Sequence, residues 1–125
     1  MSGPDLGDDG PYAEAMTTPV TDGHIPEDRL EALNARAALA ARLMKLLASE
    51  QRLRILCRLG EGEASVTELA HYADLAQTAA SQHLAKLRAE GIVAARRDGQ
   101  TIFYRLVDPA AVRMIGALCE VFGPS

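Results

Sequence analysis

The sequence predicts a mainly α-helical domain with one small β-hairpin. Apolar residues recur at helical spacing through most of residues 26–90 and again after Asp108. The period changes to short strand-type runs over residues 92–97 and 101–107, and Asp98-Gly99-Gln100 separates them. Asp-Gly between two such runs is a strong hairpin signal. We therefore expect four helices, two strands and a final helix.

The amino-terminal segment differs in composition from the rest of the chain. Residues 1–25 combine acids with Gly and Pro and hold few large apolar groups. Such a segment cannot bury enough surface to offset the entropy lost on ordering. We expect a disordered acidic tail over residues 1–25 and one folded domain over residues 26–125.

The formal charge of −4 hides an uneven distribution of charge. Residues 1–28 hold seven acids and no Lys or Arg, which leaves 13 basic and 10 acidic residues in the remainder. No apolar run approaches a membrane span, the amino end does not resemble a secretory signal, and two cysteines do not suggest a disulfide framework. We expect a cytoplasmic protein without membrane contact.

The first predicted helix covers about residues 26–47 and carries two apolar stripes. One stripe has 3-4-3-4-3 spacing, and the second occupies a neighbouring face of the latter half. A helix that is apolar on more than one side must be covered on more than one side. The cover is either a second subunit, as in a homodimer, or the domain across which this helix lies. The two stripes consist of Leu30, Leu33, Ala37, Ala40, Met44 and Leu47, and of Leu39, Leu43 and Leu46.

Residue type and spacing predict the other helices and their ends. Ser49 is a suitable N-cap for a helix that Gly60 ends. Helices over about residues 66–71 and 77–90 follow, and Gly91 closes the second of them. Asp108-Pro109 starts the last helix. The core positions expected in these helices are Leu53, Leu56, Leu59, Val66, Leu69, Ala70, Ala80, Leu84, Leu87, Val112, Ile115, Cys119 and Phe122.

Two short helices joined by a tight turn and followed by a basic hairpin form a winged helix-turn-helix. The second helix of this motif fits the DNA major groove, where each base pair shows a distinct pattern of donors and acceptors. Residues 76–88 contain no acid, which suits a phosphate backbone. The alternatives are a solvated polar face with incidental basic residues, or a winged helix that binds protein. The expected contacts to double-stranded DNA are Gln77, Thr78, Ser81, Gln82 and Lys86 in the helix, and Arg96, Arg97 and Gln100 in the hairpin.

Five short runs carry a shared pattern: residues 53–59 (LRILCRL), 65–70 (SVTELA), 79–87 (AASQHLAKL), 90–93 (EGIV) and 103–106 (FYRL). With them, the chain resembles the ArsR/SmtB family of bacterial repressors over about residues 43–122. The resemblance implies a homodimer formed by the first and last helices, a palindromic operator and an inducer that releases it. It also places His83 in the recognition helix, with an orienting or phosphate-contact role. Ala76 and Thr78 depart from the Ser and Pro that often open this helix, so Thr78 is an alternative cap.

The metal sites of that family have no counterpart in this sequence. Residues 64–69 hold no cysteine, no His follows Asp108, and His24, His71 and His83 have no spacing that gathers them on one ion. We expect neither a metal nor a cofactor; a regulator of this family that senses a metal or metalloid, or that lacks an inducer, is the alternative. We also expect no enzyme, because a Gly-rich phosphate loop and a paired carboxylate motif are both missing.

Cys57 and Cys119 allow two interpretations. They are either small buried apolar residues or a dithiol switch. A thiol-sensing subset of the family resembles residues 57–66 and responds to persulfides or oxidants by linking two helices. That resemblance places the second cysteine of the subset about one turn after Cys119, where this chain has Gly123. Cys119 is then an alternative partner for Cys57, with a reactive sulfur species or an oxidant as the inducer.

Overall fold

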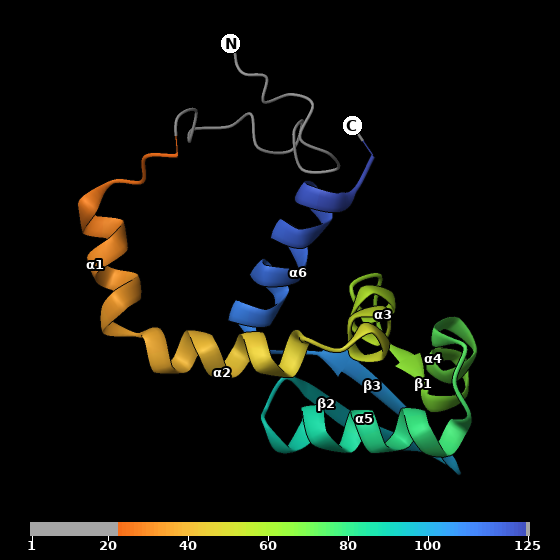
Figure 1. The fold of residues 1–125 in the computed structure, drawn as a ribbon. Helices are drawn as coiled ribbons and strands as arrows, with labels where there is room; N and C mark the ends of the chain where they lie inside the picture. Colours follow the sequence, from red (N-terminus) through yellow and green to blue (C-terminus); the bar gives the residue numbers. More distant parts are fainter. Residues whose placement is uncertain (1–22, 125) are drawn as a thin grey trace. The chain divides into compact units, whose positions relative to one another are not determined.

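The computed structural model describes residues 23–124, so most of the tail predicted to be disordered lies outside the described residues. The described residues divide into a unit of residues 41–115 and a unit of residues 23–40 and 116–124, each described by itself below. Figure 1 shows the elements in chain order: α1 (Glu27–Ala35), α2 (Ala37–Leu47), α3 (Glu50–Leu59), β1 (Ala64–Ser65), α4 (Val66–Ala73), α5 (Gln77–Ala89), β2 (Val93–Asp98), β3 (Thr101–Leu106) and α6 (Pro109–Phe122).

The core of residues 41–115 lies where α3, α4 and α5 pack on one another and on the sheet. Burial confirms the expected core positions in these helices, with Leu53 and Val66 half-buried. Ile55 is a core residue that the spacing did not identify. It is buried beside Leu56 because α3 contacts α4 and also β3, so two neighbouring residues find cover. The largest fully buried side chains are Ile55, Leu56, Leu69, Leu84 and Leu87.

The sheet has three antiparallel strands in the order β1-β3-β2. The two predicted strands are confirmed, and β1 is an addition that the prediction lacked. Its two residues pair with Tyr104 and Phe103 of β3. Two residues are too few to show any period in the sequence, so only the pairing with β3 defines this strand.

The hairpin turn is tighter than its sequence suggested. Asp98 pairs with Thr101, which leaves Gly99 and Gln100 as a two-residue loop. Gly99 has φ +64°, and Gln100 is not among the residues with positive φ. This pattern matches a type II′ turn, in which Gly takes the first central position, and not the type I′ turn favoured by Asp-Gly.

The predicted helix ends are confirmed by hydrogen bonds. Ser49 Oγ accepts from the backbone N–H of Arg52 at 3.3 Å, and an Asp108 carboxylate oxygen accepts from the N–H of Ala111 at 2.8 Å. Gly91 follows α5 with φ +78°, a conformation that favours glycine. Each cap satisfies a backbone group that the helix itself leaves without a partner.

The single helix predicted over residues 26–47 is wrong, because it ends and restarts at Arg36. Arg36 has φ −115° and ψ 23°, and its N–H turns back to the carbonyl oxygens of Asn34 and Leu33. Asn34 has low helix propensity, and α1 buries no residue. A helix of nine residues without packing has little to hold it in line with the next.

Most of the exposed large apolar side chains lie on α1, α2 and α6. Leu33 is 57% exposed and Met44 60% exposed. The face expected on α6 is correct only at Ile115, which is buried together with Ala111 one turn earlier. Val112, Cys119 and Phe122 are exposed, because α6 is covered only along its Ala111–Ile115 side.

Candidate nucleic-acid interface

The tight turn between α4 and α5 creates the helix-turn-helix. Asp74 caps α4 in the left-handed region at φ 58°, which a short polar side chain tolerates. The N–H of Leu75 then donates to the Ala70 carbonyl at 2.8 Å, and α5 begins at Gln77. Figure 1 shows α5 as a straight helix after this turn, and β2 contacts it.

The start of α4 is fixed by a reciprocal pair of hydrogen bonds. Ser65 Oγ accepts from the N–H of Glu68 at 3.1 Å, and a Glu68 carboxylate oxygen accepts from the N–H of Ser65 at 2.8 Å. These bonds lower the pKa of Glu68, the backbone bond most strongly. The capping box therefore sets the angle at which α4 enters the motif.

The outward face of α5 is polar and free of acids. Ala80, Leu84 and Leu87 are fully buried on its inner side. The five side chains expected to meet DNA are all exposed on the rest of the helix: Gln77, Thr78, Ser81, Gln82 and Lys86. Hydroxyl, amide and ammonium groups can donate to phosphates, and the amide of Gln can pair with a base edge.

Thr78 does not cap α5. The N-cap is Ala76, which makes no side-chain hydrogen bond to the helix, and Thr78 lies inside the first turn. The first N–H groups of α5 thus lack a side-chain cap from residue 76. Such groups at a helix amino end favour anions, in agreement with a position close to the DNA backbone.

His83 lies on the inner edge of α5. The side chain is half-buried, and its Nδ1 is 3.5 Å from Nη1 of Arg52 in α3. Burial, and after it the charge of Arg52, lowers the pKa of His83. A neutral ring that accepts from Arg52 suits the orienting role expected for His83 better than a direct bond to phosphate.

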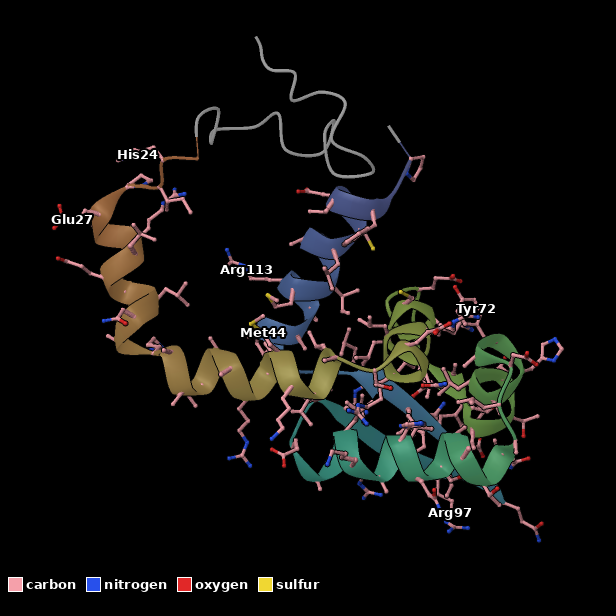
Figure 2. All side chains as sticks on the ribbon, in the orientation of Figure 1. His24, Glu27, Met44, Tyr72, Arg97 and Arg113 are labelled. Carbon is pink, nitrogen blue, oxygen red and sulfur yellow. The ribbon has the colours of Figure 1, made fainter. Side chains whose placement is uncertain are left out.

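The β2–β3 hairpin is the wing of this motif, and the structure separates its two arginines, Arg96 and Arg97. Arg96 pairs in register with Phe103, and Arg97 with Ile102, so they lie on opposite faces of the hairpin. Arg97 lies on the face of Tyr104, and Figure 2 shows it projecting beyond α5 at the edge of the domain. Gln100 is exposed in the turn. Arg97 and Gln100 are therefore exposed, as a DNA contact requires, whereas the guanidinium of Arg96 is engaged by Glu63 and Phe103.

Glu63 is the residue that binds Arg96, and no pattern in the sequence points to this pairing. Nε and Nη2 of Arg96 each donate to one Glu63 carboxylate oxygen at 2.7 Å. Arg88 was also missed as a candidate contact. It is exposed in the last turn of α5, seven residues after Ser81 and hence on the same side of the helix. That spacing could have identified it.

Both cysteines are exposed, so the interpretation as small buried residues is wrong within one chain. Cys57 lies in α3 and Cys119 in α6, in different units, and their pairing stays a prediction. At position 123 a Cβ would clash with the backbone carbonyl oxygen of Cys119. A side chain at Gly123 therefore requires the backbone to shift, which leaves Cys119 as the thiol of this helix.

The described residues offer neither a metal cluster nor a membrane segment. Across residues 23–124, no three His, Cys, Asp or Glu side chains are arranged to hold an ion. Within the same range, no helix combines the length and hydropathy needed to cross a bilayer.

Known proteins share this sequence pattern and this fold. The family described as "Bacterial regulatory protein, arsR family" matches residues 49–95. The chain is 44% identical over 107 residues to the biofilm growth-associated repressor of Agrobacterium fabrum, spanning 86% of this chain and 89% of that protein. It is 42% identical over 93 residues to the transcriptional activator HlyU of Vibrio cholerae, spanning 74% of this chain and 86% of that protein.

Solved structures of transcriptional regulators have a similar fold. The transcriptional repressor BigR from Xylella fastidiosa has a TM-score of 0.71 at 40% identity, covering 76% of this chain and 97% of that one. Reduced HlyU from Vibrio cholerae has a TM-score of 0.70 at 40% identity, covering 75% of this chain and 99% of that one. Both likenesses extend well beyond the helix-turn-helix.

Proposed function

Since this chain belongs to the ArsR family and is a winged-helix DNA-binding transcriptional regulator, we propose that it is a repressor that binds a palindromic operator as a homodimer. The observation that carries the proposal is the acid-free outward face of α5, which is flanked by Arg88 and by Arg97 of the wing. In the proposed complex, α5 lies in the major groove of the operator, and Arg97 contacts the phosphate backbone. As a regulator of this type, the protein acts in the cytoplasm.

Gln82 and Lys86 have different tasks in this proposal. The amide of Gln82 can pair with a base edge and so contribute sequence preference. Lys86 and Arg97 neutralise phosphates, which adds affinity for every sequence. Ala85 lies between Ser81 and Arg88 along the exposed side of α5, and its small side chain lets the helix approach the groove closely.

The homodimer is supported by the uncovered apolar side chains of the first and last helices. Large apolar groups left exposed together mark interaction surfaces. In a twofold dimer the two recognition helices would lie about 34–36 Å apart, one turn of DNA. These side chains are Leu30, Leu33, Leu39, Met44, Val112 and Phe122.

We propose further that Cys57 and Cys119 release the operator when they are bridged. The exposure of both thiols supports this, and so does the similarity to an HlyU structure specified as reduced. Bridging removes two protons and two electrons, which peroxide accepts on reduction to two waters. A polysulfide accepts the same electrons by cleavage of a sulfur–sulfur bond to sulfide. Tying α3 to α6 would move a helix of the dimer interface and spoil the helix spacing, with a coupling free energy of about 1–3 kcal/mol typical of such switches.

Fluorescence anisotropy with the promoter DNA upstream of the gene for this protein tests both operator binding and the thiol switch. The reduced protein should bind with an affinity that falls steeply with salt. Peroxide or polysulfide should weaken binding about 5- to 150-fold, and Cys57→Ser and Cys119→Ser should abolish the response. Absence of binding to any DNA duplex at low salt would contradict the proposed repressor function. Unchanged affinity after verified thiol modification would contradict only the switch.

A further inference from the structure

The outer face of the wing carries a cluster of three side chains that joins distant parts of the sequence. Both carboxylate oxygens of Glu63 accept hydrogen bonds from Arg96, 33 residues away, at 2.7 Å each. The Cζ of Arg96 lies 4.7 Å from the ring centroid of Phe103, in the geometry of a cation–π contact. The guanidinium of Arg96 is thus held on one edge by a carboxylate and on one face by an aromatic ring.

Glu63 is attached to the helical body of the domain. It ends the turn between α3 and β1, where the N–H of Gly62 donates to the Leu59 carbonyl at 3.0 Å. Nη1 of Arg58 donates to the Gly62 carbonyl at 3.3 Å. The carboxylate therefore projects from a turn that is hydrogen-bonded to the end of α3.

Arg96 lies in the outer half of β2, two residues before the Asp98-Thr101 pair that ends the hairpin. Its neighbour Arg97 points to the opposite face of the same strand. Any movement of β2 about the turn that holds Glu63 moves Arg97 with it. The contact between Glu63 and Arg96 therefore affects the position of Arg97, although neither residue contacts Arg97 through it.

The electrostatics of the cluster keep both groups charged. The hydrogen bond from Arg96 is the main cause that lowers the pKa of Glu63, and the same bond raises the pKa of Arg96. The side chains are 31% and 49% exposed, and surface ion pairs add little to stability. A bidentate pair, however, fixes the relative orientation of its partners. Its effect should therefore appear in geometry more than in the free energy of unfolding.

We infer that Glu63, acting through Arg96, is a positioning residue that holds the wing so that Arg97 meets the DNA backbone. The inference rests on the proposed contact between the wing and DNA. It assigns Arg96 to the support of the wing and not to phosphate. It also assigns a favourable role in DNA binding to an acidic residue.

The direction in which one substitution changes the affinity for DNA distinguishes this inference from a purely electrostatic effect. Removing a negative charge near DNA should tighten binding if only long-range charge matters. If Glu63 holds the wing, Glu63→Gln should weaken binding, because the neutral amide loses the bidentate ionic pair. Glu61→Gln is the matched control, since Glu61 is an exposed carboxylate in the same turn.

The experiment measures anisotropy of a labelled operator duplex over a series of salt concentrations with full-length protein. We expect Glu63→Gln and Arg96→Gln each to weaken binding about threefold to tenfold. Both should lower the salt slope to a similar extent, because Arg97 is displaced from its phosphate in each. The double variant should bind no more weakly than Arg96→Gln. Arg97→Gln should reduce the salt slope by about one. Circular dichroism and thermal unfolding confirm that each variant is folded, and amide exchange in the hairpin should be faster in Glu63→Gln.

Three results would overturn the inference. One is Glu63→Gln binding as tightly as Glu61→Gln or tighter. Another is a salt slope that falls in Arg96→Gln but not in Glu63→Gln, which would place Arg96 itself on a phosphate. The third is amide exchange in the hairpin of Glu63→Gln equal to that of the wild type. The proposed contact fails separately if Arg97→Gln keeps both the affinity and the slope of the wild type. Absence of duplex binding by the wild type removes both proposals.

Discussion

Arg52 and His83 lie 31 residues apart in the sequence and meet between α3 and α5, with Nη1 of Arg52 at 3.5 Å from Nδ1 of His83. Nε of the same arginine donates to the Leu46 carbonyl at the end of α2, at 2.6 Å. A cation in the first turn of a helix opposes the helix dipole, whereas one at the last carbonyls of another helix is favourable. Arg52 thus joins α2, α3 and the recognition helix through one guanidinium.

This contact predicts a pH dependence of stability. Burial, and after it the charge of Arg52, lowers the pKa of folded His83 below its ordinary value of 6.5. The unfolded chain then binds more protons as the pH falls, so stability is fully present above the unfolded pKa and decreases as the pH falls through it. Urea unfolding between pH 7.5 and 5.5 should show a smaller loss for His83→Gln than for the wild type. His71→Gln, at an exposed histidine of α4, is the control. Equal losses in the wild type and His83→Gln would refute the assignment.

Gln82 and Lys86 should respond differently to truncation. Gln82→Ala should relax the preference at one base pair of the operator by about 1–3 kcal/mol, because a bidentate pair carries that much discrimination. Lys86→Ala should weaken binding to all sequences and reduce the salt slope by about one. Competition with operators randomised at single positions measures both. A uniform loss of affinity in Gln82→Ala would show that the amide contacts the backbone instead.

The capping box should contribute measurably to folding. Ser65→Ala removes the acceptor for the N–H of Glu68, and loss of such a cap costs about 1 kcal/mol. Ser65 is buried, so water does not readily replace the hydroxyl. Urea denaturation checks the change, with Thr67→Ala, at an exposed position of the same helix, as control. A loss in Thr67→Ala as large as in Ser65→Ala would indicate a helix-propensity effect and not a cap.

Gly99 should be the least replaceable residue of the wing. Its φ of +64° costs an L-residue about 1–2 kcal/mol, although a Cβ would meet nothing within 4 Å. Gly99→Ala should therefore lower the free energy of unfolding or loosen the hairpin, as measured by amide exchange. Gln100→Ala, next to it without a positive φ, should change neither. Unaltered stability and exchange in Gly99→Ala would mean that the turn adopts another type at little cost.

The amino-acid sequence by itself determined the helices, the β2–β3 hairpin and their order from α3 onward, but not strand β1. Spacing placed Leu84 and Leu87 in the core, and local chemistry placed the caps at Ser49 and Asp108. These features are predictable because helix periodicity, capping and tight turns depend on residues a few positions apart. The exposed polar face of α5 follows from the same spacing.

The tertiary structure alone decided which distant residues meet. Strand β1 exists only because β3 pairs with it, and Arg36 interrupts the first helix where α1 lacks packing. Arg96 and Arg97, equivalent in the sequence, differ because the register places Arg96 beside Phe103 and Glu63 and places Arg97 on the opposite face of the hairpin. Contacts across 31 or 33 residues leave no periodic trace in the sequence. They arise only when packing and strand register bring separate elements together.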